Sequence, residues 1–407
     1  MQTIAGGVCA AKGFSAAGLY CGLKKKEKPD LALIVSEVPA AAAAVYTKNV
    51  VKAAPIHVSK RHLADGMLKA VVINSGNANA CAPDGEENAL VMCAHAANAL
   101  GVPTEQVAVA STGVIGQSMT PKMDLVKAGI ADMIPLLSAG EAGSDLAAQA
   151  IMTTDLTRKE LAIAFTLSGK PVHLGGIAKG SGMIHPNMGT MLCFLTTDAA
   201  ISPALLAQAF RQAVDRSFNR ITVDGDCSTN DFGLVMANGM AGNPEITEEN
   251  ADYEDFLSAL TYLCIYLAKE IASDGEGATH LITCTVKNAP SELVATTTGK
   301  SVIGSSLVKS AVFGKDANWG RILCAMGYAG ADFDPALVAI SLASEAGEVQ
   351  VCENGRGLSF DEELAVQILT PHEVEIRIDM GQGDAQSICW GCDLTYDYVK
   401  INGSYRS

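Results

Sequence analysis

Residues 175–198 read GGIAKGSGMIHPNMGTMLCFLTTD, and this segment changes character halfway along. Its first part is rich in glycine, and its second part, from Thr190, is almost entirely apolar. Glycine allows tight turns and a close approach of the backbone to a ligand, whereas a short apolar run is typical of a buried strand. The segment therefore predicts a flexible glycine-rich lead followed by a strand that begins at Thr190.

The junction between Gly189 and Thr190 allows a particular chemistry. A hydroxyl oxygen can attack the preceding carbonyl carbon when the residue before it is small, because no bulky side chain crowds the strained geometry. Hydrolysis of the resulting ester frees a threonine α-amine, whose reference pKa of about 7.7–8.0 suits it to take the proton of its own hydroxyl. From the residues alone, an ordinary strand start is the favoured interpretation.

The rest of the chain alternates strand-like and helical patterns, which predicts a mixed α/β fold with helices packed on sheets. The alanine run from Ala40 to Ala44 is interpreted as a close-packed segment. The expected strands are Leu31–Ser36, Ala70–Ile73, Val107–Ala110, Leu161–Leu167, Leu281–Lys287, Val338–Leu342 and Val374–Ile378. The expected helices are Glu86–Leu100, Ser138–Met152, Ser202–Phe218 and Tyr253–Ala272.

Composition excludes several classes of protein. With 407 residues, 49% of them hydrophobic and 18% charged, the chain is neither a mini-protein nor disordered. The longest uncharged apolar stretch, Phe256–Ala268, is shorter than the ~20 residues of a membrane span, so we expect a buried helix and no membrane partner. The net charge of −15 disfavours nucleic acid as a partner. Most acidic residues follow residue 189, which suggests two lobes and ordinary solubility, or attraction of a cationic substrate.

The cysteines and the N-terminus indicate the compartment. Twelve cysteines are scattered through the chain, and Met1–Phe14 lacks the basic and apolar regions of a secretory signal. We therefore expect a cytoplasmic protein with reduced thiols. Cys389 and Cys392 have C-x-x-C spacing without a second ligand pair, so buried structural thiols are the favoured interpretation.

Familiar catalytic motifs are missing from the sequence. The seven histidines never pair at metal-ligand spacing, and no serine has glycine at both −2 and +2. Phosphate-binding and dinucleotide-binding glycine fingerprints are absent as well. We expect no metal and no resident cofactor.

Several motifs together resemble the glutamate N-acetyltransferase/ornithine acetyltransferase family of arginine biosynthesis. The segment Lys179–Leu192 resembles the self-cleavage site of that family, and the likeness extends over essentially the whole chain. The other motifs that carry it are Asn74–Cys81, Ser111–Gly116, Met152–Asp155, Ser217–Asp226, Asn318–Arg321 and Trp390–Tyr398 with Ile401–Asn402.

The resemblance implies an enzyme that passes the acetyl group of N-acetylornithine to glutamate in a ping-pong cycle, through an ester on Thr190. It further implies the two-lobed layered α/β architecture of that family, cleaved into an α chain, 1–189, and a β chain, 190–407, with two copies of each. Acetyl-CoA as an additional co-substrate is left open, because no sequence feature discriminates the bifunctional members.

The resemblance also assigns individual roles. Thr190 corresponds to the nucleophile and Gly189–Thr190 to the cleavage site. Thr112 and Gly113 match the pair of donors that stabilise the oxyanion, although Ser-Thr-Gly is also ordinary turn chemistry. The positions that bind substrate in the family, together with Thr190 itself, correspond to Thr153, Lys179, Glu276, Asn402 and Ser407.

Two positions depart from the family pattern. Gly189 stands where alanine is common, and Cys227 stands where threonine is common. Neither removes a reacting group, although the flexibility of glycine is expected to slow self-cleavage. Residues near the site without an assigned catalytic role are Asn187, Asp224 and Asp226, interpreted mainly as turn formers, and His185 and Cys193.

Two other functions remain open at this stage. An aminopeptidase or amidase would use the same N-terminal threonine but give the acyl group to water. A non-catalytic amino-acid-binding protein would retain the pocket and never cleave itself. Acetyl transfer that depends on glutamate separates the first alternative, and self-cleavage separates the second.

Overall fold

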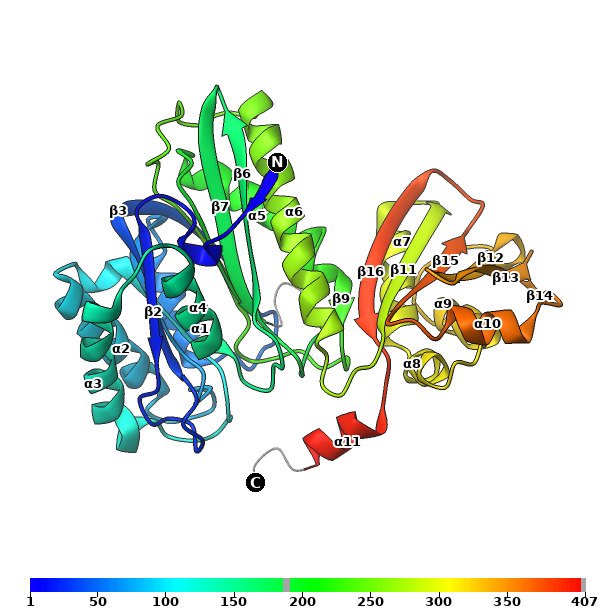
Figure 1. Ribbon diagram of the computed structural model, residues 1–407, viewed down its shortest axis with the longest axis horizontal. Helices are drawn as coiled ribbons and strands as arrows, with labels where there is room; N and C mark the ends of the chain where they lie inside the picture. The colour runs from blue at the N-terminus through cyan, green and yellow to red at the C-terminus, as the bar shows by residue number, and fades with distance from the viewer. Residues whose placement is uncertain (186–190, 404–407) are drawn as a thin grey trace. The chain divides into compact units, whose positions relative to one another are not determined.

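The computed structural model describes residues 1–185 and 191–403 (Figure 1). These described residues form two compact units. The first comprises 1–180, 191–219 and 227–267, and the second comprises 181–185, 220–226 and 268–403. Residues on both sides of the predicted division at Gly189–Thr190 contribute to the first unit, and that division, which concerns chain cleavage, stays a prediction.

A mixed sheet forms the centre of the first unit. Its strands follow the order β1-β6-β7-β8-β10-β3-β4-β5, and β2 pairs with β3. The strands are β1 (Gln2–Ile4), β2 (Phe14–Leu19), β3 (Leu31–Tyr46), β4 (Met67–Asn74), β5 (Val107–Ser111), β6 (Lys159–Leu167), β7 (Lys170–Lys179), β8 (Leu192–Thr197) and β10 (Phe232–Ala237). The strands expected at Leu31–Ser36, Ala70–Ile73, Val107–Ala110 and Leu161–Leu167 are confirmed. The strand expected from Thr190 is described from Leu192 onward as β8.

Both faces of this sheet are buried in its central strands. Along β3, Ala32 and Ile34 belong to one hydrophobic cluster, whereas Leu31 and Leu33 belong to another. Side chains alternate between the two faces of a strand, so a strand covered on both sides reads as a continuous apolar run. The alanine run from Ala40 to Ala44 lies within the same strand, mostly buried, which confirms close packing.

The prediction of a flexible glycine-rich lead is wrong for Gly175–Lys179. These residues are buried in β7, which pairs antiparallel with β6 and β8. A Cβ on Gly175 would lie 1.8 Å from the Gly7 carbonyl oxygen, and one on Gly176 would lie 2.3 Å from Leu195. The glycines therefore permit close packing of backbone in a strand, and they do not mark a loop.

Helices cover the sheet of the first unit. Helix α4 packs on β2, α1 and α2 pack on β5, and α5 packs on β3. The bounds are α1 (Ala54–His62), α2 (Gly85–Leu100), α3 (Met123–Met133), α4 (Gly140–Ile151), α5 (Pro203–Asp215) and α6 (Ala251–Ser273). The four predicted helices are confirmed.

Helix α6 contains the long apolar stretch. Among the described helices, α6 alone is long and apolar enough to cross a membrane, judged by length and composition. However, 56% of its most apolar part is buried inside the protein. Phe256, Leu260, Leu263 and Leu267 are fully buried. The burial matches the predicted core helix.

The second unit is built on a separate sheet with the order β14-β13-β12-β15-β11-β16-β9. Helix α7 packs on β11 and β16, over a single hydrophobic core. Its strands are β9 (Ile221–Thr222), β11 (Leu281–Ala289), β12 (Ala339–Ser344), β13 (Gly347–Glu353), β14 (Arg356–Gly357), β15 (Glu373–Asp379) and β16 (Ala385–Cys392). Its helices are α7 (Glu292–Gly304), α8 (Ser306–Phe313), α9 (Trp319–Gly327), α10 (Glu362–Ile368) and α11 (Tyr396–Asn402).

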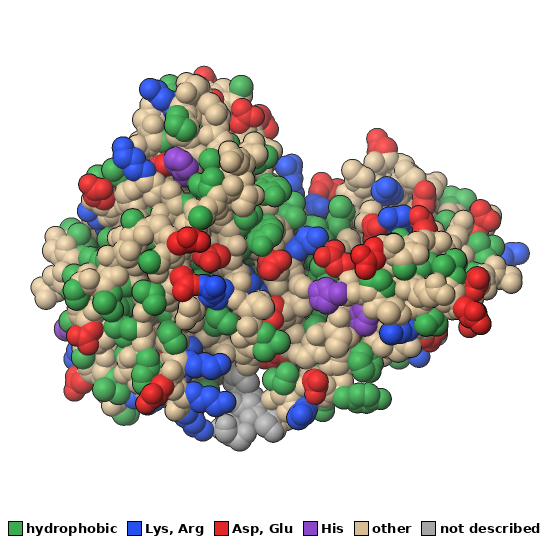
Figure 2. Space-filling model, in the orientation of Figure 1, with side chains coloured by type: hydrophobic (Ala, Val, Ile, Leu, Met, Phe, Trp, Pro, Cys, Tyr) green, Lys and Arg blue, Asp and Glu red, His purple; other side chains and the backbone are tan. Residues whose placement is uncertain are grey.

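Charged side chains are distributed over the surface. On the face that Figure 2 shows, Lys and Arg are interspersed with Asp and Glu. Such mixing is the ordinary pattern of a solvated surface.

Candidate functional site

Asparagine side chains fix the loops that follow β4 and β5. The Asn74 amide donates to Ser111 Oγ at 2.7 Å, and its Oδ1 accepts from the Asn77 N–H at 3.0 Å. The Thr112 N–H donates to the Asn74 carbonyl at 2.9 Å. Because Asn74 and Ser111 are buried, these bonds hold the two loops in one arrangement.

Thr112 and Gly113 lie directly after β5, in the turn that the sequence predicts. Gly113 has φ +131°, and a Cβ there would lie 2.8 Å from the backbone nitrogen of Asn77, so a side chain would both strain and crowd the turn. Within the described residues, neither the Thr112 hydroxyl nor the Gly113 N–H donates a hydrogen bond to another residue. Both donors are therefore available to an oxygen of a bound substrate.

Asn230 connects these loops to the strands β8 and β10. Its amide donates to the carbonyls of Ser111 at 2.8 Å and Ala78 at 2.6 Å. Two residues further on, the Phe232 N–H donates to the Met191 carbonyl at 2.9 Å. Hydrogen bonds on Asn230 and Phe232 thus link Ser111, which precedes Thr112, to Met191, which follows Thr190 in the sequence.

Asp231 is a buried carboxyl beside this connection. Burial raises its pKa well above the usual range, and the neighbouring Cys227 thiol raises it further, while Lys179 opposes both. Its Oδ2 has no hydrogen-bond partner in the part of the chain that the structure describes. Burial of a carboxyl disfavours its charged form.

Lys179 lies at the end of β7 in a buried cluster of charges around Asp155. The Asp155 carboxylate accepts from Lys159 Nζ at 2.9 Å and from the Thr153 N–H at 2.9 Å, and Lys179 Nζ lies 4.0 Å from it. Burial alone would raise the pKa of Asp155, but Lys179, Lys159 and the Thr153 N–H hold it well below its usual range. The structure brings two predicted substrate-binding residues, Thr153 and Lys179, to one carboxylate.

Lys24 adds a third cation to this cluster. Its Nζ donates to the carbonyls of Met152 at 2.7 Å and Pro29 at 2.6 Å. Burial lowers the pKa of Lys24 to about 8, and Lys179 is among the groups that lower it further. The buried carboxylate of Asp30 acts on Lys24 as Asp155 acts on Lys159 and Lys179, so the cluster combines three lysines with two carboxylates.

In the second unit, Glu276 and Asn402 meet. The Asn402 amide donates to Glu276 Oε2 at 2.7 Å, and Glu276 is 7% exposed. The Glu276 N–H donates to the Ser181 carbonyl at 2.9 Å. A Cβ on Gly182 would lie 2.3 Å from the Glu276 carboxylate, so a side chain there would displace this acid from its present position.

Helix α11, which carries Asn402, is docked onto the Glu276 loop. Thr395 Oγ1 donates to the Gly277 carbonyl at 2.6 Å. A Cβ on Gly277 would lie 2.7 Å from the Tyr398 nitrogen, and the Tyr398 hydroxyl lies 3.3 Å from the Asp224 carboxylate. The end of the chain up to Asn402 is therefore held in place by specific contacts.

Several predicted residues lie outside the described part of the chain. These are Gly189 and Thr190 at the cleavage site, Asn187, and Ser407. Among the other candidates, Asp224 accepts from the Asp226 N–H at 3.2 Å, as expected of a turn former, and it also accepts from the distant Met183 and Ile184 N–H groups.

The remaining histidine and cysteine candidates are buried or half-buried. His185 lies 3.0 Å from Thr222 Oγ1, and burial lowers its pKa to about 4. Burial raises the pKa of Cys193 well above its usual range. Cys389 and Cys392 are free and buried, which confirms the structural interpretation of the C-x-x-C pair. No group of three or more potential metal ligands occurs among the described residues.

Sequence reasoning missed Asn74, Asn230, Asp155, Asp231 and Lys24 as parts of the site. Asn74 and Asp155 lie within motifs that carry the family resemblance, but their hydrogen-bond and ion-pair partners belong to distant segments of the chain. Lys24 carried no signal, since a run of three lysines is ordinarily a solvated turn.

Comparison with known proteins gives whole-chain matches. Residues 15–407 match the model of the ArgJ family. The arginine biosynthesis bifunctional protein ArgJ of Symbiobacterium thermophilum is 52% identical over 410 residues, covering 100% of both chains. The protein of that name from Bacillus subtilis is 48% identical over 99% of this chain and 97% of its own. A crystal structure of arginine biosynthesis bifunctional protein argJ from Bacillus halodurans, 44% identical, aligns with a TM-score of 0.51 over 53% of this chain and 100% of its own.

Proposed function

Since this chain belongs to the ArgJ family, we propose that it transfers the acetyl group of N-acetylornithine to the amine of glutamate through an ester on Thr190. The relatives are named arginine biosynthesis bifunctional proteins, and they match the chain along its whole length. The transfer would proceed in two halves: the Thr190 hydroxyl attacks the acetyl carbonyl and releases ornithine, and the glutamate amine then attacks the ester and releases N-acetylglutamate.

Before the first turnover, the chain would cleave itself between Gly189 and Thr190. The Thr190 hydroxyl attacks the Gly189 carbonyl, and the peptide C–N bond breaks, which forms an ester and frees the α-amine of Thr190. Water then hydrolyses the ester to the Gly189 carboxylate and the free hydroxyl, and the amine serves as the base. The Bacillus halodurans crystal chain supports this step, because its entire length corresponds to 53% of the present chain. A β chain from Thr190 to the end makes up about that share of the 407 residues.

The observation that carries the proposal is the connection through Asn230. The Asn230 side chain donates a hydrogen bond to the Ser111 carbonyl, next to Thr112. Phe232, two residues after Asn230, donates its N–H to the Met191 carbonyl. This connection supports Thr112 and Gly113 as donors to the oxygen that becomes negative when Thr190 attacks. One such donor is worth roughly 3–4 kcal/mol in other acyl transferases and hydrolases.

The charged clusters are proposed to bind the amino-acid part of the substrates. Lys179, with Lys24 beside it, would bind a carboxylate, and Thr153 would supply a neutral hydrogen-bonding group. Glu276 and Asn402 keep their expected substrate-binding roles, and a carboxylate such as Glu276 suits the amine of ornithine. The role of Ser407, the arrangement of two α and two β chains, and the cytoplasmic location also stay proposals.

The test is the time course of ornithine release with and without glutamate. Without glutamate, one equivalent of ornithine per enzyme should appear in a burst and release should then stall, because the acetyl ester has no acceptor. With glutamate, turnover should follow ping-pong kinetics. Steady ornithine and acetate release without glutamate would assign the chain to the amidases, and an uncleaved chain without any release would assign it to the binding proteins.

A further inference from the structure

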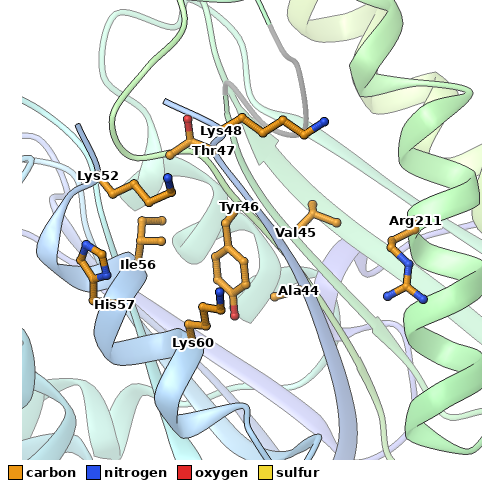
Figure 3. A pocket seen from close by; sticks show the side chains of 10 residues that line it. All are labelled: Ala44, Val45, Tyr46, Thr47, Lys48, Lys52, Ile56, His57, Lys60 and Arg211. Carbon is orange, nitrogen blue, oxygen red and sulfur yellow. The ribbon is translucent and has the colours of Figure 1, made fainter. Parts of the chain in front are cut away.

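Lysines of the first unit differ in the charges that face them. Lys52 is one of three lysines that line a pocket of about 740 Å³ at the end of β3 (Figure 3), and no acidic residue lies among the described residues of that lining. Lys24, in the loop between β2 and β3, instead faces two buried carboxylates, Asp30 and Asp155. Its surroundings therefore couple its charge to the cluster that is proposed to bind substrate.

The Lys24 side chain connects its own loop to a distant segment. Its Nζ donates to the Pro29 carbonyl at 2.6 Å, within the loop, and to the Met152 carbonyl at 2.7 Å, directly after α4. Hydrogen bonds from an ionised donor are stronger than those from a neutral donor. The strength of this connection therefore depends on whether Lys24 is protonated.

The Met152 carbonyl lies next to the predicted substrate-binding residues. Met152 precedes Thr153, whose N–H donates to the Asp155 carboxylate at 2.9 Å. Lys179 Nζ lies 4.0 Å from the same carboxylate. Through one carbonyl, Lys24 thus holds the turn in which both predicted residues meet Asp155.

Charged groups also fix the rest of the loop between β2 and β3. The fully buried Asp30 carboxylate accepts from the Cys21 N–H at 2.8 Å and from the Lys24 N–H at 2.9 Å. Lys122, just before α3, donates from Nζ to the Leu23 carbonyl at 2.7 Å. These bonds give the backbone around Lys24 one defined conformation.

The same loop packs toward the turn of the predicted oxyanion donors. A Cβ on Gly76 would lie 2.4 Å from Leu23 Cβ, and a Cβ on Gly113 would lie 2.8 Å from the carbonyl carbon of Gly76. Both glycines permit a close approach that a side chain would prevent. The loop therefore contacts the segments of both predicted functions, substrate binding and oxyanion stabilisation.

The Lys24 ammonium is half-buried among charges of both signs. Burial lowers the pKa of Lys24 to about 8, Asp30 and Asp155 oppose this effect, and Lys28 and Lys179 add to it. An ordinary lysine has a pKa of about 10.4, so Lys24 loses its charge at a lower pH than most lysines do. The other titratable groups of the loop and of the residues bonded to it are Tyr20, Cys21, Lys122 and Lys159.

We propose that Lys24 is a positioning residue of the substrate site, whose ammonium keeps Thr153 and Lys179 in the arrangement that binds an amino-acid carboxylate. This inference rests on the proposed function, because it takes the Asp155 cluster as the substrate site. The charged form holds the Met152 carbonyl and adds positive charge beside Lys179, and the neutral amine does both less well. Affinity for the amino acid therefore falls as the pH rises through the pKa of Lys24.

The test measures the dissociation constant of ornithine by titration calorimetry on the purified full-length protein. Ornithine carries no acetyl group, so no transfer takes place during the measurement. Ornithine and other groups of the protein also titrate between about pH 6.5 and 9.5, so each variant is compared with the wild type at the same pH. Lys24→Arg is the central variant, because arginine can donate to both carbonyls and stays protonated throughout.

The expected results separate charge from shape. At pH 7, Lys24→Arg should bind ornithine within a few-fold of the wild type, whereas Lys24→Gln should bind at least about tenfold more weakly. Above pH 8 the wild type should lose about tenfold in affinity relative to Lys24→Arg and should approach Lys24→Gln. A thermal melt checks that each variant is folded.

Lys52→Gln is the matched control. Lys52 is also half-buried, and its Nζ also donates to a backbone carbonyl, that of Asn49, at 2.8 Å. This variant should bind ornithine like the wild type at every pH. Equal weakening by Lys52→Gln would show a general effect of lost positive charge and would overturn the proposal.

Two other results would also overturn it. One is a ratio of wild-type to Lys24→Arg affinity that stays constant with pH, which a merely structural lysine would give even if Lys24→Gln failed to fold. The other is no binding of ornithine to the wild type at pH 7. Failure of the proposed function has a different result, because N-acetylornithine would then transfer no acetyl group to glutamate, whatever the affinities for ornithine.

Discussion

The Asn402 side chain donates a hydrogen bond of 2.7 Å to the Glu276 carboxylate, which joins helix α11 to the loop after α6. The two residues are 126 positions apart in the sequence, and the resemblance assigns each of them separately to substrate binding. Because of this hydrogen bond, the orientation of the Glu276 carboxylate depends on helix α11.

The variant Asn402→Asp tests this dependence. It replaces the donor by a second carboxylate, so Glu276 loses a hydrogen bond and gains a repulsive neighbour. We expect KM for N-acetylornithine to rise by about tenfold or more, with a smaller change in kcat. Steady-state kinetics measures both. Asn98→Asp on the exposed face of α2 makes the same chemical change elsewhere and should leave KM unaltered; an equal rise there would indicate a general effect of charge.

The variant Thr112→Ala tests the oxyanion donor. The hydroxyl is proposed to meet charge that develops only in the transition state, so kcat should fall by roughly a hundredfold while KM stays near the wild-type value. Thr112→Ser keeps the hydroxyl and should retain most of the activity. A change in KM alone would show that Thr112 only binds substrate.

The variant Gly113→Ala tests the backbone geometry of the same turn. A Cβ at this position meets the Asn77 nitrogen at 2.8 Å, in addition to the strain of φ +131°. Strain of this kind costs of order 1–3 kcal/mol, and the close contact adds to it. Gly101→Ala is the matched control, because Gly101 also has positive φ but has open space around it. Urea unfolding and activity should show a larger loss for Gly113→Ala, and equal losses would contradict the role of the contact.

The pH dependence of stability tests the Asp155 cluster. The folded-state pKa of Asp155 is lower than its unfolded value of about 3.9, so its charged form stabilises the fold above that pH and this stabilisation is lost as the pH falls below it. Asp155→Asn should lower the free energy of unfolding at pH 7 by roughly 3–5 kcal/mol, because Lys159 and Lys179 lose their buried partner.

Denaturant unfolding of both proteins as a function of pH measures this difference. The difference in free energy of unfolding between wild type and Asp155→Asn should be constant near neutral pH and should become smaller below about pH 4. Asp124→Asn, which removes a fully exposed partner of Lys127, should change little at any pH. A gap that widens on acidification would contradict the assignment of a lowered pKa.

Local patterns in the sequence predicted several of the central strands and four of the helices. Apolar runs such as those in β4 and β5 are covered on both faces, so the periodicity and the burial agree. The pattern failed at β7, because the meaning of Gly175 depends on the backbone of Gly7, which the chain brings near only after folding. Glycine permits both a loop and a close approach, and the local sequence does not distinguish the two.

The site was predictable to a smaller extent. The resemblance identified Lys179 and Glu276 but not their partners. Asp155 forms an ion pair with Lys179 across 24 positions of sequence, and Asn402 donates a hydrogen bond to Glu276 across 126. Asn230 shows the same limit more clearly, since its amide serves two loops that are both more than 100 residues away. Only the folded chain shows that the amide of Asn230 donates to carbonyls in both loops.

Intact-mass spectrometry of the purified protein, incubated with N-acetylornithine and without glutamate, tests the acetyl-Thr190 intermediate most directly. We expect two fragments, 1–189 and 190–407, with one acetyl group on the second fragment, located on Thr190 by peptide mapping and removed when glutamate is added. Thr190→Ala should remain a single chain of 407 residues without the acetyl group. A wild-type chain that stays intact, or a cleaved chain that turns over without ever carrying acetyl on Thr190, would contradict it.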